Sequence, residues 1–413
     1  MSVLLTRRAV VQAAVEVTYD TPVAVGANDG VLVATPMFTI TPNVLERNYT
    51  RKDLSPMPHI IGRKIAKMEF ETELRGNGKQ NSGISTDAPI IARLFRACGY
   101  ALSAFATPSI LGPFDVGDSP NEVVWSGDTG AAATNTDMIQ YVATVTTGGP
   151  SGTAMIAVTS DVAGEGDAAA VVTSGTAFSF GTEGLTIIPT FTGNLTIGQQ
   201  WVIWLRPVGI ALDPRSDNFE SITLVMHKDS TLHTMPGSFG TFEITATAGN
   251  FATVKWTFTG TYVEPVDDPL PNPLFEKTIP SQVELARLKV NLFQAVVDKF
   301  TFNQANDIQI RPDVSSSDGY IGTRIVSRKP VGGIDPEADL VANNDFWGQL
   351  AAAQRMPFQM RVGHAPGNTV WFMAPSVQYS GLTYADRQGI LTYDAGLTFS
   401  RVNGDDEAHF FLA

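Results

Sequence analysis

Cysteine is almost absent from this chain of 413 residues, which contains only Cys98. A single cysteine cannot close a disulfide within the chain, so we expect folding in a reducing cytoplasm and stability from packing or assembly. Long apolar runs are also absent, since none approaches the roughly 18 residues that span a bilayer. The apolar stretch near the N-terminus is interrupted by Gln12 and Glu16 and predicts no export signal. We therefore do not expect a membrane protein.

Basic residues are missing from a long central segment. Between Ala97 and Leu205 there is no lysine or arginine against nine acidic residues, so this segment carries −9 of the net charge of −13 and leaves −4 for the rest of the chain. The acidity is therefore a property of this segment. Hydrophobic residues make up 43% and charged residues 17%, which excludes global disorder. The length predicts about two to four domains.

Clusters of catalytic or metal-binding residues are missing as well. The sequence Gly76-Asn77-Gly78-Lys79 lacks the full spacing of a phosphate-binding loop. The carboxylates from Asp335 to Asp339 are interrupted by Pro336 and lack the spacing of calcium ligands. Cys98 lies on the apolar face of an expected helix, where a buried small hydrophobe is the better interpretation than a nucleophile. The five histidines are scattered, at His59, His227, His233, His364 and His409. We expect no enzyme activity, no metal site and no cofactor.

Residues 109–207 differ from both flanks and predict an inserted domain. They are rich in Gly, Ala, Thr and Val, and short strand-like runs are separated by turn-forming residues, a pattern typical of a small immunoglobulin-like β-sandwich. The runs cover residues 140–146, 154–160, 185–191 and 200–205. The alternative is that these residues belong to one larger sheet, because periodicity alone does not set domain boundaries.

Around the insert, a strand, a loop, a helix and a closing pair of strands occur twice in the same order. The first copy contains Gly62, a helix opened by Thr86 or Asp87 with Pro89 in its first turn, and strands at 239–248 and 253–262. The second contains Gly322, a helix capped near Asn344 or Asp345, and strands at 376–384 and 390–399. The two copies are separated by a proline-rich stretch that is unsuited to helix or central strand.

The sequence therefore predicts a mainly β protein with five parts. They are an N-terminal arm (1–37), a discontinuous first β-domain (38–108 and 208–264), the insert (109–207), a linker (265–280) and a second β-domain (281–413).

The strand at residues 67–74 is the most informative one. Period-two alternation places Met68, Phe70, Thr72 and Leu74 on one face and Lys67, Glu69, Glu71 and Glu73 on the other. One face is expected to be buried and the other to be acidic and wet. The simpler alternative is an ordinary solvated sheet face. In the second copy, Ser327 and Lys329 stand in place of Lys67 and Glu69, and Pro330 ends the run.

Most of the chain outside the insert resembles the major tail tube proteins of long, non-contractile-tailed bacteriophages. The resemblance is carried by residues 67–78 followed by 88–100, by 238–273, and by 324–350 with the loop Gly332-Gly333-Ile334-Asp335-Pro336. It implies two tandem β-sandwich or partial-barrel domains, each with a flanking helix, that assemble into rings whose inner strands form one channel wall. It also implies that the insert is an extra surface domain.

Further expectations follow from the same resemblance. The protein would be assembled in the bacterial cytoplasm and reside in the virion tail. Its partners would be other copies of itself, a tape measure protein, and tail terminator and distal tail proteins. Duplex DNA would pass through the channel without specific binding.

The size of such a channel predicts how many chains form a ring. Barrels of about 16 to 18 strands only just leave an aqueous pore, and duplex DNA needs more. If each copy supplies about four inner strands, three chains supply about 24, which predicts a trimer with pseudo-sixfold symmetry. Because basic residues bind phosphate, the wall should be acidic, and Glu69, Glu71 and Glu73 are the lumen candidates.

Stacked rings need an interface that does not close on itself, and long loops are natural couplers, together with the N-terminal arm. The candidates are Arg47, Tyr49, Arg51 and Asp53 in the first copy and Asp313, Asp318 and Tyr320 in the second. Before assembly these loops are expected to be disordered in solvent.

The sequence thus predicts a structural virion protein that polymerises into a tail tube for DNA ejection into the host. The main alternative is a β-rich decoration or host-surface-binding protein. The inner tube of a contractile tail and a hydrolase with an unrecognised site are further alternatives.

Overall fold

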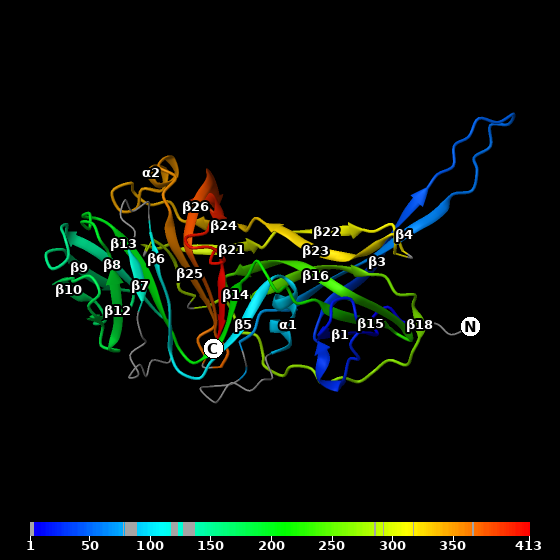
Figure 1. The fold of residues 1–413 in the computed structure, drawn as a ribbon, viewed down its shortest axis with the longest axis horizontal. Helices are drawn as coiled ribbons and strands as arrows, with labels where there is room; N and C mark the ends of the chain where they lie inside the picture. The colour runs from blue at the N-terminus through cyan, green and yellow to red at the C-terminus, as the bar shows by residue number, and fades with distance from the viewer. Residues whose placement is uncertain are drawn as a thin grey trace.

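The computed structural model describes residues 4–76, 78, 89–116, 123–126, 137–284, 286–291, 293–316, 318–365 and 367–413. The fold is mainly β, with 54% strand and 4% helix, and its sheets are open. This confirms the fold class expected from the sequence. Eighteen strands are joined into one extended sheet, which is accompanied by a five-stranded, a three-stranded and a two-stranded sheet (Figure 1).

Eight antiparallel strands form a continuous run within the large sheet. In order of pairing they are β3 (Ala34–Leu45), β4 (Ile60–Glu73), β17 (Thr253–Thr261), β16 (Thr231–Thr247), β21 (Val297–Asn303), β24 (Val331–Pro336), β27 (Ile390–Phe399) and β26 (Val370–Arg387). The order β3-β4-β17-β16 recurs as β21-β24-β27-β26. The first four strands are called the first half of the run and the last four the second half.

Ten further strands complete the large sheet. They are β1 (Ala9–Val15), β2 (Gly30–Val31), β5 (Tyr100–Phe105), β14 (Gly209–Pro214), β15 (Ile222–Lys228), β18 (Val266–Asp267), β19 (Leu288–Val290), β20 (Phe293–Gln294), β25 (Met356–Val362) and β28 (His409–Leu412). A short 3-10 helix, η1 (Ala27–Asp29), precedes β2. The expected N-terminal arm is wrong for β1, which pairs with β15 and contributes the fully buried Val11 and Ala13. Its alternating apolar residues make it a core strand.

Two short helices occupy related places in the two halves. In α1 (Ile90–Ala97), Phe95 packs against Phe242 of β16 and Trp256 of β17, with ring centroids 4.8 and 5.0 Å away. In α2 (Phe346–Ala351), Phe346 packs against Tyr379 of β26 and Tyr393 of β27 at 5.9 and 5.2 Å. Each helix therefore anchors an aromatic side chain on the last two strands of its half.

The ends of the helices test the expected caps. Asp345 caps α2 by accepting a hydrogen bond from the Gly348 backbone N–H, as expected. Pro89 is the N-cap of α1, so its expected place inside the first turn is wrong by one position. Thr86 and Asp87 lie outside the described residues.

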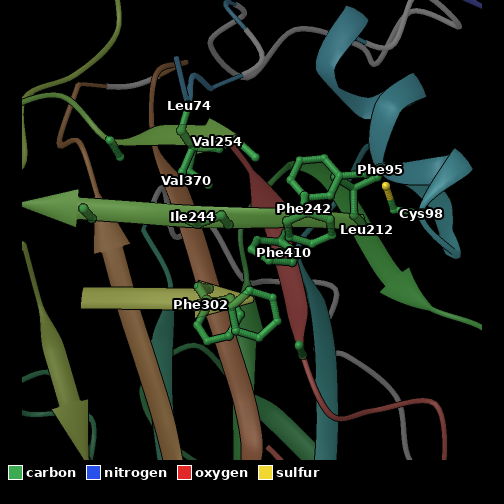
Figure 2. Close-up of a cluster of buried hydrophobic side chains, with 14 of the residues drawn as sticks. Leu74, Phe95, Cys98, Leu212, Phe242, Ile244, Val254, Phe302, Val370 and Phe410 are labelled. Carbon is green, nitrogen blue, oxygen red and sulfur yellow. The ribbon is translucent and has the colours of Figure 1, made fainter. Parts of the chain in front are cut away.

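The hydrophobic core is continuous across both halves. Figure 2 shows Phe242 and Phe410 between Phe95 of α1 and Phe302 of β21, with Phe410 centred 5.0 Å from Phe95 and 5.9 Å from Phe302. One cluster of buried side chains includes residues of β4, β16, β21, β26 and β28. The two halves therefore share one sheet and one core.

The insert has sheets and a core of its own. Its five-stranded sheet has the order β10 (Asp167–Val171), β9 (Met155–Ser160), β8 (Ile139–Thr147), β13 (Gln200–Arg206) and β6 (Ser109–Asp115). A three-stranded sheet contains β11 (Phe178–Phe180), β12 (Leu185–Thr190) and β7 (Val124–Ser126). Tyr141 of the first sheet meets Phe180 of the second edge to face at 5.2 Å, inside a separate buried cluster. Within the described residues, these strands do not join the large sheet.

Polar contacts attach the insert to β25. Trp204 Nε1 donates a hydrogen bond of 3.0 Å to Gln359 Oε1, and both side chains are buried. Arg361 Nη1 lies 2.8 Å from Asp137 Oδ2. A buried apolar cluster that includes Phe114, Trp204 and Trp371 lies at the same junction.

Candidate functional site

One face of the eight-strand run carries mainly polar side chains, and no sheet of the described residues pairs over it. Every second residue of these strands points away from the core, and none of the residues below is buried. This polar face consists of Met37 and Thr39 on β3; Lys67, Glu69, Glu71 and Glu73 on β4; Thr253, Lys255, Thr257 and Thr259 on β17; Thr241, Glu243, Thr245 and Thr247 on β16; Lys299, Thr301 and Asn303 on β21; Val331, Gly333 and Asp335 on β24; Asp394, Gly396 and Thr398 on β27; and Gln378, Gly381 and Thr383 on β26. Threonine is its commonest residue, and six carboxylates face three lysines.

The strand register arranges these residues in rows across both halves. One row contains Ala34, Glu71, Lys255, Glu243, Asn303, Val331, Thr398 and Gln378. A neighbouring row contains Glu73, Thr253, Thr245, Thr301, Gly333, Gly396 and Gly381. Because each row crosses the junction between β16 and β21 without a break, the polar face is one surface.

The alternation expected at residues 67–74 is confirmed. Met68 and Phe70 are 0% and 2% exposed, whereas Glu71 is exposed. Glu69 Oε1 lies 2.5 Å from Lys67 Nζ, and this hydrogen bond lowers the pKa of the Glu69 carboxyl. Glu73 pairs with Arg75. The polar face is therefore acidic along β4, and its carboxylates are partly neutralised by basic side chains of the same chain.

The alignment of Ser327 and Lys329 with the acidic strand is wrong. Strand β23 (Tyr320–Arg328) ends before Pro330 and pairs with β22 (Asn306–Pro312) in a separate sheet, so β24 takes the place beside β27 that β4 takes beside β17. Pro330 lacks a backbone N–H and follows the end of β23. Counting residues straight through Pro330 therefore gives the wrong register for β24.

The two halves can be aligned from a shared bulge. The β15–β16 pair steps from Ile222↔Ser238 to Leu224↔Met235, and β25–β26 steps in the same way from Met356↔Val377 to Phe358↔Ala374. The second half also has one additional residue between Tyr379 and Gly381.

Counting from the bulge places Thr245 and Ala385 at equivalent positions. The partner strands follow, because Thr245 pairs with Thr253 and Ala385 with Thr392. Glu73 lies beside Thr253, and Glu337 bridges to Thr392. Glu73 therefore corresponds to Glu337, and Glu71 to Asp335.

Acidic residues thus recur in the second half at positions the sequence did not reveal. Arg387 lies 2.9 Å from the Asp335 carboxylate and 3.6 Å from that of Glu337. The acid pair of the second half is therefore partly neutralised, as the glutamates of β4 are.

The first group of stacking candidates lies at the tip of a long hairpin. Strands β3 and β4 extend past the body as an arm, and residues 46–59 join them at its end (Figure 1). Arg47, Tyr49, Arg51 and Asp53 are all exposed there. The Arg47 guanidinium lies 5.9 Å from the centre of the Tyr49 ring, and Arg51 lies 3.4 Å from Asp53. These side chains are free to meet another molecule.

The second group lies on the β22–β23 hairpin and contains one error. Asp318 is exposed and Asp313 is half-buried near its turn, but Tyr320 is 5% exposed and its hydroxyl donates a 2.7 Å hydrogen bond to the Lys64 carbonyl oxygen. Tyr320 therefore fixes the hairpin to β4 and is not available for stacking. In the sequence, a tyrosine beside a turn fits either an exposed stacking contact or a buried anchor.

The cysteine and two of the histidines considered as catalytic or metal-binding candidates have contacts that suit a structural role. Cys98 is buried, and burial raises the pKa of its thiol. His227 Nε2 lies 2.8 Å from Asp268, and His409 Nδ1 lies 2.7 Å from Asp213. No group of three or more His, Cys, Asp or Glu residues in the described part of the chain could hold a metal ion. Asn77 and Lys79 lie outside that part.

None of the described helices is long and apolar enough to cross a bilayer. No protein-family model and no curated protein matches the chain. The features of the molecule that bear on function are therefore the polar face, the arm and the edges of the sheet.

Proposed function

We propose that this chain is the repeated subunit of a bacteriophage tail tube, with three chains in each ring and the polar face lining the channel. The observation that carries the proposal is the polar face itself. This sheet face is not buried at any of its described positions, is continuous through both halves and is rich in threonines, carboxylates and glycines. Such a face suits a wall that duplex DNA slides past.

The charges of the polar face disfavour DNA binding. Each phosphate neutralised by a basic side chain releases counterions and adds affinity. Lys67 is paired with Glu69, and Lys255 lies between Glu71 and Glu243 in the strand register. Lys299 faces Thr247 on one side, and on its other side its backbone N–H donates a 2.7 Å hydrogen bond to the Asp335 carboxylate of β24. The wall therefore offers phosphates few uncompensated positive charges.

The dimensions also suit a DNA channel. Eight strands per chain give 24 for three chains. At about 4.8 Å between strands and a tilt of about 40°, such a ring measures about 150 Å around and about 50 Å across between backbones. This leaves a bore of a few nanometres after side chains are added. The ring needs no strands from the insert.

The insert fits a position outside the wall. It packs through Trp204 and Phe114 against Trp371, near the start of β26, and Phe411 of β28. None of these residues belongs to the polar face. The most acidic segment of the chain is therefore separate from the surface proposed to face DNA, and the acidity of the insert is no argument for the channel.

The decisive experiment is negative-stain electron microscopy of the purified protein. Hollow tubes of uniform bore are expected, and a three-dimensional map should show three chains per ring. Six chains per ring, or a ring with one half outside the wall, would contradict the proposed trimer. Discrete particles that bind capsids or host cells without forming tubes would favour the decoration or surface-binding alternative.

A second experiment tests the charge of the wall. Replacing Glu69, Glu71 and Glu73 together with lysine should leave tube assembly intact and slow DNA ejection from phage that carry the variant, because phosphates would then meet basic side chains. The matched triple replacement with glutamine separates loss of acidity from gain of basic charge. Unchanged ejection by the lysine variant would remove these residues from the lumen.

A further inference from the structure

Both outer edges of the eight-strand run are open. Along its described residues, β3 pairs only with β4, which leaves its other edge without a partner strand. At the opposite end of the run, β26 pairs with β25 as far as Val377, and beyond that point β27 is its only partner among the described strands. Natural sheets usually cover or block such edges, because unpaired N–H and C=O groups recruit other strands.

The chain already contains a template for closing such an edge. In the first half, β16 is the counterpart of β26, and its outer edge is paired with β21 in the register Glu243↔Asn303, Ile244↔Phe302 and Thr245↔Thr301. Strand β21 is in turn the counterpart of β3, since each is the first strand of its half. At the junction, the fourth strand of the first half (β16) therefore pairs with the first strand of the second half (β21).

Equivalent side chains show what is missing at the open edge. Ile244 is 3% exposed beneath β21, whereas its counterpart Tyr384 is 62% exposed. The Tyr384 ring lies 5.5 Å from Trp347 and 5.3 Å from Tyr393, and Trp347 is itself 37% exposed. An apolar patch with these three rings thus lies where the first half has a covered core.

The first strand of the chain has the matching side chains. The pairs Met37↔Glu69 and Phe38↔Met68 on β3 correspond to Thr301↔Gly333 and Phe302↔Gly332 on β21, so Phe38 is the counterpart of the buried Phe302. Phe38 is only half-buried. Pro36 and Pro42, which cannot donate to a ladder, bracket the five residues between them, and five residues of β21 (Lys299 to Asn303) pair with β16.

We propose that β26 of one chain pairs antiparallel with β3 of a second copy, in the register that joins the two halves within a chain. Thr383 then lies opposite Thr39, Tyr384 opposite Phe38 and Ala385 opposite Met37. The aromatic patch of Trp347, Tyr384 and Tyr393 is covered by Phe38 of the incoming strand. That this pairing closes a ring of three rests on the proposed function; the pairing itself rests on the two open edges and the internal template.

Disulfide trapping tests the register directly. The Gln304 N–H donates to the Phe242 carbonyl at 3.0 Å, which makes the neighbouring pair Glu243↔Asn303 a non-hydrogen-bonded one. Its counterpart Thr39↔Thr383 should therefore have Cα atoms about 4.5 Å apart, within the range that a disulfide spans. Thr39→Cys and Thr383→Cys together should convert the oxidised protein from single chains to species of two and three linked chains. Cys98 can stay, because it is buried.

Two controls make the result specific. Glu243→Cys with Asn303→Cys should cross-link within one chain, which shows that this geometry permits the bond. Thr39→Cys with Ala385→Cys is displaced by two residues, about 7 Å, and should cross-link poorly. Tubes that form without the Thr39–Thr383 bond, or that trap the displaced pair equally well, would overturn the register and leave the tube proposal intact. Linked chains without tubes would support the pairing and count against the tube.

A second variant tests the apolar patch without cysteines. Because Tyr384 is mostly exposed in the single chain, Tyr384→Asp should preserve folding yet shift the protein from rings to single chains in size-exclusion chromatography. Val171→Asp, on the insert strand β10, is the matched control, since Val171 is 54% exposed and should leave ring formation unchanged. Rings of normal yield from Tyr384→Asp would contradict the proposed pairing.

Discussion

The two halves of the eight-strand run use the same pairing order but differ at their outer edges. Strand β16 is covered by β21, whereas its counterpart β26 is uncovered beyond Val377. At equivalent positions the exposed fraction therefore changes from 3% at Ile244 to 62% at Tyr384. An internal repeat thus shows which exposed apolar residues await a partner, because the same position is buried elsewhere in the chain.

The hairpins of the two halves differ in a second way. Strands β3 and β4 stay paired from the large sheet out to residues 45 and 60, so the first hairpin is a continuous extension of the sheet. In the second half, residues between β21 and β22 and between β23 and β24 break the strands, and β22–β23 forms a sheet of its own. Tyr320 then ties that hairpin to β4. The first hairpin is therefore the better candidate for reaching a neighbouring ring.

The largest contrast is expected from the same charge placed at the two equivalent positions. Ile244→Asp should destabilise the single chain by more than about 4 kcal/mol, because a carboxylate would be buried without a partner. Tyr384→Asp should change the unfolding free energy by less than about 1 kcal/mol, because the site is mostly exposed. Urea denaturation followed by fluorescence measures both. Similar losses in the two variants would mean that the two positions are not equivalent in the single chain.

The helix anchors give the next contrast. Phe95 is fully buried and touches the rings of Tyr100, Phe242, Trp256 and Phe410, so Phe95→Ala should cost about 4 kcal/mol of unfolding free energy. Phe346 is buried to a similar degree but lies against fewer rings, and Phe346→Ala should cost about 3 kcal/mol. Thermal and urea unfolding of both variants at one pH provide the comparison. A larger loss for Phe346 would reverse the expected order of the two anchors.

Much of the β architecture could be predicted from the sequence because single strands have local signals. The alternation of Met68 and Phe70 with Glu69 and Glu71 marked β4, and the insert strand expected at 200–205 is β13 (Gln200–Arg206). The shared sheet and core could not be predicted, because the pairing of β16 with β21 joins residues about 60 positions apart and leaves no local pattern.

The errors at the candidate site have local physical causes. Pro330 lies between β23 and β24, so counting residues through it aligned Lys329 with Glu69. In the sheet, Gly333 takes that position. Tyr320 looked like a loop contact because a hydroxyl and a ring suit either a surface or an anchor. The threonines of β16 and β17 were visible as every second residue, and their alternation could have indicated the polar face.

The tie between the hairpins gives a smaller effect. Tyr320→Phe removes the hydroxyl that donates to the Lys64 carbonyl, and it should cost about 1 kcal/mol, because one buried hydrogen bond is lost while the ring stays. Hydrogen exchange of the β22–β23 amides should become faster than in the parent chain. Tyr49→Phe, at the exposed tip of the arm, is the matched control and should change neither measurement. Unchanged exchange in Tyr320→Phe would show that the tie does not hold the hairpin.

The smallest effect concerns an ion pair beside α1. Burial alone would raise the pKa of the Glu220 carboxyl, but two 2.6 Å hydrogen bonds from Arg96 and the charge of Arg215 hold that pKa below its ordinary value. Its stabilisation is therefore present above about pH 4.3, the pKa of a free glutamate, and is lost as the pH falls through the lower folded pKa. Because the carboxyl is partly exposed, the contribution should be less than about 1 kcal/mol. Unfolding free energies of the parent chain and Glu220→Gln should differ at pH 7 and converge as the pH falls through the folded pKa of Glu220, and a constant difference would assign the effect to packing instead.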